Sequence, residues 1–520
     1  MMAARVLIAF SFILGASISQ ILDQPVLTLS ETEDKVIFSV VALNNTLSGT
    51  QTDPMEANSV PFLQLFDPES KKIEILMPFS SRNYTYKFTD TSSYIRTSHF
   101  FSAKVIRGRK YIWSVTANNT LGPFHFKLRN YDTHYDTRMI VLADMDNTVN
   151  AQPTWQALSR IDLSTVDALV HAGDFAYNVN SDDGRRGDLY FNSMANIVTE
   201  VPYLIIAGNH EAFDGSKFLN YRFRMPQYKP EWDNNVYTVL ENNALFLFIN
   251  YDWFLKGKNN KSMMATLQYT QSLLAAWEKD PRVRWRVVVS HRPLYCGHTE
   301  KPECQVNPLF LKPFEDTYRK YKVDVFIAAH EHIYERLKVL NNFEVVKQPA
   351  EKRAKNITGY SDPTQPIMVV NGLSGGEKLI KEWETHNIND YNFAGEPTYL
   401  DLRFNEDHFE VRCVLSSNGV TIDGVRIAKT TPFEGSKKGF LNKIPVAVFF
   451  VAFLLVIAGA YFLLRYLSVK NDERRRSLSL MAHSKEDRLK DAEAMAGLNS
   501  QTLDHSSSMD NTAHKDGSYI

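Results

Sequence analysis

The sequence has few cysteines, no excess of charge and no internal repeat. Its 520 residues include three cysteines, and 58 basic residues nearly balance 59 acidic ones, which leaves a formal net charge of −1. The thiols are too few, and too poorly spaced, for a cysteine-based zinc site or a thiol catalyst. The near-zero net charge gives no reason to propose nucleic acid or another polyanion as a partner. The function must therefore be sought in local motifs.

Two of the cysteines enclose a short loop. Cys296 and Cys304 are close in sequence, and we expect a disulfide between them if the chain passes through an oxidising compartment. Cys413 is then left over. The alternative is that all three residues are free, partly buried thiols, and the spacing alone does not decide between the two.

The N-terminus has the pattern of a secretory signal peptide, predicted over residues 1–19. Arg5 forms a small basic region, residues 6–15 are apolar, and small residues offer cleavage sites at Ala16, Ser17 and Ser19. A short buried helix at the start of a domain is the alternative. Glycosylation sequons follow at Asn44, Asn83, Asn118, Asn260 and Asn356, and none lies in the C-terminal tail.

A second apolar segment lies near the C-terminus. Residues 444–464 contain no charged side chain, and their 21 positions match the roughly 20 residues that a helix needs to cross a bilayer. We therefore expect a stalk over residues 431–443, a single transmembrane helix over 444–467 and a disordered cytosolic tail over 468–520. This topology predicts a type I membrane protein of the secretory or endolysosomal pathway or the cell surface, with its folded domains lumenal or extracellular.

The folded part divides into two domains with different patterns. Residues 20–135 contain short strand-like stretches separated by turns, which predicts a small β-sandwich. These stretches are residues 36–40, 84–88, 111–115 and 124–128. Over residues 136–430, strand-like runs alternate with helical stretches such as residues 269–279, which predicts an α/β domain.

Five apolar runs of the α/β domain each end in a polar motif. The runs are residues 139–143, 168–172, 203–207, 287–289 and 325–329. Short, continuous apolar runs are typical of strands that are buried on both faces. Ligands of open α/β sheets bind beyond the carboxyl ends of the strands, so we expect all five motifs to converge on one edge of a sheet.

The five motifs share residues with hard oxygen and nitrogen ligand atoms. Seven such residues follow the runs: Asp144, Asp174, Tyr177, Asn209, His291, His330 and His332. Groups of this kind suit Fe, Mn or Zn. Two such ions roughly 3.5–4 Å apart form a clamp for phosphoryl transfer. Asp174 is the natural bridge between two ions, because its motif lies central among the five.

In order and spacing, these motifs resemble those of the calcineurin-like metallophosphoesterases, and specifically of the purple acid phosphatases. The family pattern is D-x-G, G-D-x-x-Y, G-N-H-[DE], a lone His after a strand, and G-H-x-H. In this chain it corresponds to residues 144–146, 173–177, 208–211, 291 and 330–332. The resemblance extends over roughly residues 30–428. It implies a metallophosphoesterase β-sandwich flanked by helices (αββα), preceded by an all-β domain of fibronectin or immunoglobulin type.

The resemblance also implies a role for each candidate residue. A ferric ion would be held by Asp144, Asp174, Tyr177 and His332. A divalent ion (Fe, Zn or Mn) would be held by Asp174, Asn209, His291 and His330. His210 would contact the phosphate and protonate the leaving group, and Glu211 would orient His210. With a metal-bound hydroxide as the attacking group, the chain is expected to be a membrane-anchored acid phosphatase that hydrolyses phosphomonoesters.

Three departures from the family pattern affect these expectations. Ala143 and Ala329 replace the glycines before the first and last motifs, and both are small enough to keep the packing at the strand ends. Asp146 replaces the glycine of D-x-G, and it either accepts a hydrogen bond beside the ferric site or changes the metal preference. The loop after His291 lacks the paired histidines of the plant pattern. His298 is the local candidate for substrate contact, and an exposed loop residue is the alternative.

Two other functions stay open. The same scaffold serves phosphodiesterases and nucleotide hydrolases, and one sequence does not reveal the loops that decide between them. The other alternative is a receptor or adhesion ectodomain without catalysis, for which residues 186–188 spell an adhesion tripeptide, a match also expected by chance. Loss of a ligand would favour this alternative, and none of the seven is lost. His171 is expected to be a core residue or a neighbour of the ligands, and the oligomeric state is not readable.

Overall fold

The computed structural model describes residues 21–44, 60–89, 92–131, 136–255, 259–297, 302–342, 344–380, 387–433 and 446–498. Contacts divide the chain into two units, Met1–Ser436 and Lys437–Ile520. The predicted signal peptide and most of the predicted stalk lie outside the described residues. The first unit contains both predicted folded domains.

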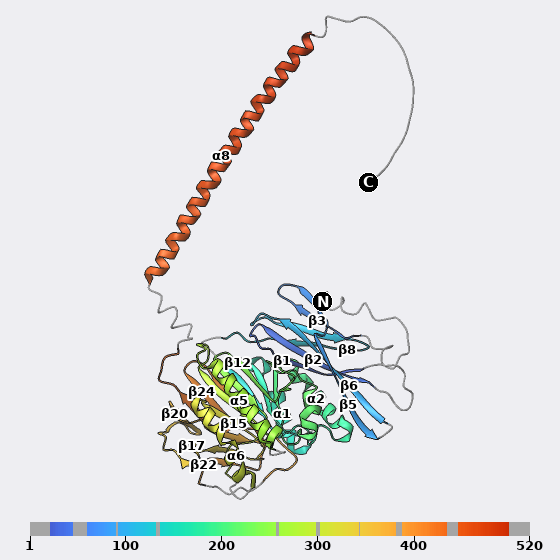
Figure 1. Cartoon of the computed structure of the whole chain (residues 1–520), viewed down its shortest axis with the longest axis vertical. Helices are drawn as coiled ribbons and strands as arrows, with labels where there is room; N and C mark the ends of the chain where they lie inside the picture. Colours follow the sequence, from blue (N-terminus) through green and yellow to red (C-terminus); the bar gives the residue numbers. More distant parts are fainter. Residues whose placement is uncertain are drawn as a thin grey trace. The chain divides into compact units, whose positions relative to one another are not determined.

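The N-terminal domain consists of two antiparallel four-stranded sheets (Figure 1). One has the order β1-β2-β6-β5, with strands at Ile21–Leu29, Lys35–Asn44, Ser92–Lys104 and Ser80–Thr89. The other has the order β4-β3-β7-β8, with strands at Lys72–Leu76, Phe62–Asp67, Tyr111–Thr116 and Thr120–Phe126. The rings of Phe38 in β2 and Trp113 in β7 pack 4.8 Å apart between the sheets. The predicted all-β region ahead of the α/β domain is therefore confirmed.

The α/β domain contains a second pair of sheets. The eight-stranded sheet has the order β11-β10-β9-β23-β24-β25-β20-β19, with strands at Tyr203–Ile206, Ala168–Ala172, Thr137–Leu142, Thr398–Phe404, His408–Leu415, Thr421–Ala428, Ile357–Ser361 and Glu351–Ala354. The seven-stranded sheet has the order β12-β13-β14-β15-β21-β16-β22, with strands at Val236–Glu241, Ala244–Ile249, Trp285–Ser290, Val325–Ala328, Ile367–Asn371, Tyr334–Leu337 and Asn389–Phe393. A small hairpin pairs β17 and β18, Leu340–Asn341 and Glu344–Val345.

Helices connect and cover these strands. The described residues of this unit form the α-helices α1 to α6, at Gln152–Arg160, Arg185–Val198, Lys217–Asn220, Asp252–Leu255, Asn260–Trp277 and Pro302–Lys320. Short 3-10 helices η1 to η4 lie at Val149–Ala151, Leu163–Thr165, Asp182–Gly184 and Phe213–Ser216. Alternate residues of β14 face opposite sides. Val287 and Val289 join the core shared with the eight-stranded sheet, whereas Val288 packs with Leu274 of α5 and Phe314 of α6. This layering matches the expected αββα arrangement.

The five apolar runs are all strands, but they lie in two sheets rather than one, which corrects the expectation of a single sheet edge. β9, β10 and β11 are parallel neighbours in the eight-stranded sheet. β14 and β15 are parallel neighbours in the seven-stranded sheet. The two sheets contact each other through aromatic rings, since the ring centroids of Phe246 and Phe404 lie 5.8 Å apart and those of Trp285 and Phe409 lie 6.0 Å apart. Runs buried on both faces look alike in sequence, so the pattern does not tell one sheet from two.

The second unit contains one long helix, α8, at Val446–Leu498. Residues 468–498, predicted to be disordered, continue this helix, in keeping with their many Glu, Lys, Arg, Leu and Ala residues, which are strong helix formers. Among the described residues, no helix has the length and the apolar character that crossing a membrane requires. The predicted transmembrane helix over 444–467 is therefore not supported, and the side chains of residues 446–456 lie outside the description.

Candidate metal centre

The five motifs meet at the carboxyl ends of strands from both sheets. Asp144 follows β9, Asp174 follows β10 and Asn209 follows β11 in the eight-stranded sheet. His291 follows β14, and His330 follows β15 closely, in the seven-stranded sheet. Hydrogen bonds and short contacts link Tyr177 and His332 to Asp144. The structure thus brings all seven predicted ligands together, with each sheet supplying part of the set.

Three of the residues form one compact group. Tyr177 Oη donates a hydrogen bond to Asp144 Oδ1 at 3.1 Å and lies 2.9 Å from His332 Nε2. His332 Nε2 is also 3.3 Å from Asp144 Oδ1. Burial, and after it the charge of Asp144, raises the pKa of Tyr177 well above its ordinary value. Burial lowers the pKa of His332, but Asp144 outweighs it and raises that pKa to about 8. These groups hold protons in places where a cation would replace them.

A second group surrounds His291. Its Nε2 atom lies 3.0 Å from Asn209 Oδ1 and 3.3 Å from Asp174 Oδ2. One ligand atom each from Asp174, His291 and His330 lie within 4.8 Å of one another. Burial lowers the pKa of His291, but the charges of Asp174 and Asp144 outweigh it and raise that pKa to about 10. A wholly buried imidazole is stabilised as a cation only because the carboxylates around it make the site strongly negative.

Asp174 lies where the two groups meet. It contacts His291 of the second group, and its charge also acts on Tyr177 and His332 of the first group. Its Oδ1 atom accepts a hydrogen bond of 2.9 Å from the backbone N–H of His210. This position suits the bridging role expected of Asp174.

The loops that carry the ligands have unusual backbone conformations. Asp144, Asp174, Tyr177 and His330 have φ angles of +52°, +54°, +38° and +72°, in the left-handed region that non-glycine residues rarely adopt. Such strain gathers at functional sites, where the surrounding structure maintains it. Gly208 allows a close approach, because a Cβ atom there would lie 2.2 Å from Asp174 Oδ1. The glycine of the third motif is therefore required by packing against the second.

His210 is positioned by a residue that the motifs did not suggest. The sequence predicts that Glu211 orients His210, and this expectation is wrong. Glu211 instead accepts hydrogen bonds of 2.9 Å from the backbone N–H groups of Asp174, Phe175 and Gly208, so it fastens two ligand loops together. His210 Nδ1 is hydrogen-bonded to Oδ1 of Asn178. The only sequence signal for Asn178 is a polar side chain directly after Tyr177.

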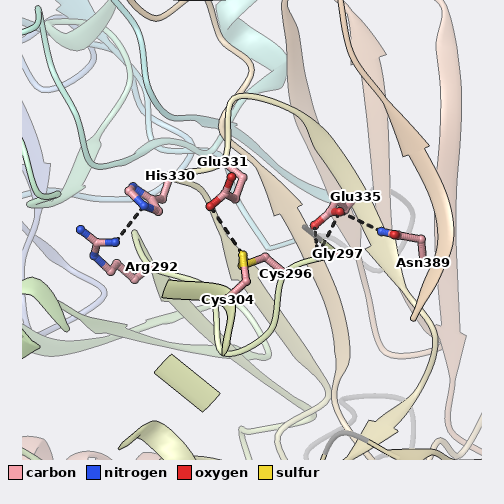
Figure 2. Close-up of a disulfide and its surroundings, with 8 residues drawn as sticks. All are labelled: Arg292, Cys296, Gly297, Cys304, His330, Glu331, Glu335 and Asn389. Atoms are coloured by element: carbon pink, nitrogen blue, oxygen red, sulfur yellow. Dashed lines mark hydrogen bonds between the residues drawn. A yellow bond between two sulfur atoms is a disulfide. The ribbon is translucent and has the colours of Figure 1, made fainter. Parts of the chain in front are cut away.

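Two arginines near the ligands were also missed. Arg186 Nη2 lies 2.8 Å from each carboxylate oxygen of the buried Asp146. Arg292 Nη1 lies 2.8 Å from His330 Nε2, a contact drawn in Figure 2. The Nε atom of Arg292 donates to Asp252. Arg186 lies in a helix remote from Asp146 in sequence, so no motif spacing predicts their contact. Arg292 follows His291 directly, and its charge was the available signal.

The loop after His291 is closed by the expected disulfide. Cys296 and Cys304 are bonded, with Cα atoms 5.3 Å apart, and Cys304 Sγ lies 3.9 Å from Glu331 Oε1 (Figure 2). The backbone N–H of Gly297 donates to both oxygens of Glu335, at 3.1 and 3.0 Å. The loop is thereby tied to the segment that carries the last two histidine ligands. His298 lies outside the described residues.

The adhesion tripeptide is not an exposed loop. Arg186 is engaged with Asp146, and Asp188 is buried between Arg96 and Arg222, at 2.6 and 2.7 Å. All three tripeptide residues belong to α2. His171 is wholly buried in the core, as expected, with Nδ1 2.9 Å from the hydroxyl of Tyr203.

Comparisons with known proteins agree with this geometry. The model of the calcineurin-like phosphoesterase family matches residues 132–334. Acid phosphatase type 7 from Homo sapiens is 25% identical over 356 residues, which cover 63% of this chain and 75% of that protein. Acid phosphatase type 7 from Danio rerio is 25% identical over 332 residues, covering 59% and 71%. The structure of the purple acid phosphatase PPD1 from yellow lupin seeds matches with a TM-score of 0.61 and 17% identity, covering 80% of this chain and 75% of that one. Residues 132–334 therefore match the calcineurin-like phosphoesterase family, and the chain is similar to acid phosphatases, among them a purple acid phosphatase whose fold it shares.

Proposed function

We propose that this protein is an acid phosphatase that hydrolyses phosphomonoesters at a dinuclear metal centre. The observation that carries the proposal is the convergence of seven hard ligands into two groups that meet at Asp174. One group offers a phenol, a carboxylate and an imidazole, and the other offers an amide and two imidazoles. This division fits two ions of different character with one carboxylate between them.

The residues fit metal ions on electrostatic grounds as well. Asp144 and Asp174 are 0% and 1% exposed, and within the described part of the chain their ion-pair partners are histidines and never Lys or Arg. Buried carboxylates require a compensating cation. A ferric ion would be held by Asp144, Asp174, Tyr177 and His332. A divalent Fe, Zn or Mn ion would be held by Asp174, Asn209, His291 and His330. Such ions lower the pKa of bound water and neutralise charge on the phosphoryl group.

His210 is the proposed proton donor to the leaving group. The hydrogen bond of its Nδ1 atom with Asn178 fixes the ring, and its Nε2 atom lies 3.9 Å from Asp174 Oδ2, so this nitrogen faces the ligand groups. A proton on Nε2 would pass to the alcohol oxygen as the P–O bond breaks. His298 stays a candidate for substrate contact on sequence grounds. A receptor without catalysis would not require this alignment of His210 with an intact ligand set.

We also propose that the catalytic domain faces the lumen of the secretory or endolysosomal pathway or the outside of the cell. The Cys296–Cys304 disulfide supports this location, because disulfides persist in oxidising compartments. The signal peptide and the type I membrane anchor remain sequence predictions. Staining of intact and permeabilised cells with an antibody against the α/β domain would test the orientation, and a purely cytosolic signal would contradict it.

Hydrolysis by the full-length protein tests the function. We expect an aryl phosphate monoester to be cleaved fastest at acid pH between about pH 4 and about pH 8, and the matching diester to be cleaved much more slowly. Asp174→Asn is the matched control, since it keeps the shape of the side chain and removes its charge. Preference for the diester would favour the phosphodiesterase or nucleotide hydrolase alternative. Metal-loaded protein that cleaves neither ester would refute the proposal.

A further inference from the structure

Asp146 stands where the family pattern has a glycine, two positions after the ligand Asp144. Its side chain is 0% exposed, so its charge lies in the protein interior beside the proposed ferric site. An unpaired carboxylate in this place would attract a metal ion. Asp146 is paired, because Arg186 Nη2 lies 2.8 Å from both of its oxygens.

The same guanidinium reaches the loop that carries Tyr177. Arg186 Nε donates a hydrogen bond to the backbone carbonyl of Ala176, the residue before Tyr177. Arg186 therefore joins the first and second ligand loops through a side chain. Their backbones also meet, with Ala176 N–H donating to the Met145 carbonyl at 3.0 Å. Tyr177 has a φ of +38°, a strained conformation that surrounding contacts must maintain.

Arg186 is itself held in place by the first turn of α2. Asp188, two residues on, is fixed between Arg96 of the N-terminal domain and Arg222. Gly187 packs so closely that a Cβ atom there would lie 2.5 Å from the carbonyl oxygen of Val179. These contacts fix the backbone of the first turn of α2, from which the Arg186 guanidinium reaches both Asp146 and the Ala176 carbonyl.

We infer that Arg186 and Asp146 form a positioning pair that holds the Tyr177 loop in its metal-binding conformation, and that Asp146 is a structural anion rather than a metal ligand. This inference rests on the proposed metal centre. Both partners are needed together: Asp146 orients the guanidinium fork, and Arg186 neutralises the carboxylate. The planar guanidinium is required because it donates to three acceptor atoms, the two Asp146 oxygens and the Ala176 carbonyl oxygen. A lysine ammonium on a flexible stem does not reproduce this arrangement of donors.

The pair predicts a non-additive pattern of variants. Arg186→Gln leaves the buried Asp146 carboxylate free to approach the metal. We therefore expect a roughly 10- to 100-fold loss of affinity for the ferric ion, the usual effect of removing a group that orients a ligand. Asp146→Gly in the Arg186→Gln background removes both charges and restores the family's residue. This double variant is expected to recover the part of the lost affinity that the unpaired carboxylate causes, whereas the part that follows from the missing hydrogen bond to the Ala176 carbonyl stays lost. Arg186→Lys is expected to regain little.

The experiment uses full-length protein loaded with ferric and zinc ions. Its readouts are the absorbance band that a tyrosinate gives on ferric iron, the metal retained against a competing chelator, and kcat and KM for the aryl monoester. We expect Arg186→Gln to shift or weaken the band and to lower kcat more than it raises KM. Arg185→Gln is the matched control, because Arg185 is the neighbouring arginine of the same helix and pairs with the exposed Asp182. Circular dichroism checks that each variant folds. If Arg186→Gln misfolds, the double variant is compared with the wild type in its place.

The outcomes separate the inference from the proposed function. Wild-type protein that takes up no metal refutes the proposed function and the inference with it. If the wild type binds metal and turns over substrate, but Arg186→Gln matches it in band and metal retention, only the inference is refuted. If Asp146→Gly loses metal equally with and without Arg186, then Asp146 is a ligand, which also overturns the inference. If the wild type binds metal but shows no tyrosinate band, the inference is tested by comparing the metal retained by the wild type with that retained by Arg186→Gln.

Discussion

Replacing Asp188 by asparagine is expected to weaken the junction between the two folded domains. The Asp188 carboxylate accepts hydrogen bonds from Arg96 at 2.6 Å, from Arg222 at 2.7 Å and from Gln24 at 2.9 Å. Arg96 and Gln24 belong to the N-terminal domain, whereas Asp188 and Arg222 belong to the α/β domain. The two guanidinium side chains are only 3% and 2% exposed, so water does not replace a lost partner.

The magnitude follows from what asparagine retains. Whichever oxygen of Asp188 becomes nitrogen, one guanidinium then faces a donor, and both arginines lose the negative charge. Removing one partner of a buried ion pair costs about 3–5 kcal/mol. Burial raises the pKa of Asp188, but Arg222 and Arg96 outweigh it and lower that pKa below the ordinary 3.8. The contribution is therefore complete above about pH 4 and is lost as the pH falls through the lowered value.

Urea unfolding followed by tryptophan fluorescence measures this loss. Trp113 reports on the junction, because its Nε1 atom donates to the Thr199 carbonyl at the end of α2. We expect the free energy of unfolding of Asp188→Asn to fall by about 3–5 kcal/mol at neutral pH, with a smaller difference in acid. Asp182→Asn is the control, since Asp182 pairs with the exposed Arg185 and its loss should change little. Equal midpoints for Asp188→Asn and the wild type would refute this account of the junction.

Three further predictions follow from the site and the core. Gly208→Ala should lose metal, measured by elemental analysis, because the new Cβ atom would lie 2.2 Å from Asp174 Oδ1; normal metal content would contradict this. Asn178→Leu should lower kcat roughly 100-fold while metal content is kept, because His210 Nδ1 loses its partner; an unchanged kcat argues against His210 as the acid. Burial raises the pKa of Glu241 from 4.5 to about 7. The contribution of Glu241 to the stability of the fold is therefore complete below about pH 4.5 and is lost as the pH rises through 7. Denaturation at several pH values across this range should show the free energy of unfolding of the wild type falling by up to about 3 kcal/mol relative to that of Glu241→Gln. Parallel profiles of unfolding free energy against pH for the two proteins would exclude this effect.

The seven candidate ligands could be picked out from the sequence because each of them lies within a few residues of the end of an apolar run. A buried apolar run ends, the chain turns, and a residue such as Asp144 or His291 is placed at the strand end. These relations extend over a few residues, within the reach of periodicity and motif spacing. The order of strands does not follow such rules. β9 pairs with β23, which lies more than 250 positions later, and no local pattern indicates that contact.

The positioning residues were missed for the same physical reason. Arg186 meets Asp146 from a different helix, and Glu211 was assigned to the histidine beside it rather than to the backbone of the preceding motif. A side chain's partner is set by packing between distant segments, whereas its chemical type is set by the sequence. The helix over residues 468–498 shows the converse error, since charged, Ser-rich composition was interpreted as disorder although its residues also favour helix.

Asp144, Asp146, Asp174 and Glu211 are buried carboxylates at the site, and their hydrogen-bond partners differ. Asp146 is neutralised by a guanidinium, and Glu211 accepts three backbone N–H groups. Asp144 and Asp174 each accept one backbone N–H and otherwise face histidines and Tyr177. Of these four carboxylates, Asp144 and Asp174 therefore have lone pairs directed at groups that release a proton when a cation arrives. The contacts, more than the sequence positions, thus identify which acids of the motifs are suited to hold metal and which to hold the loops.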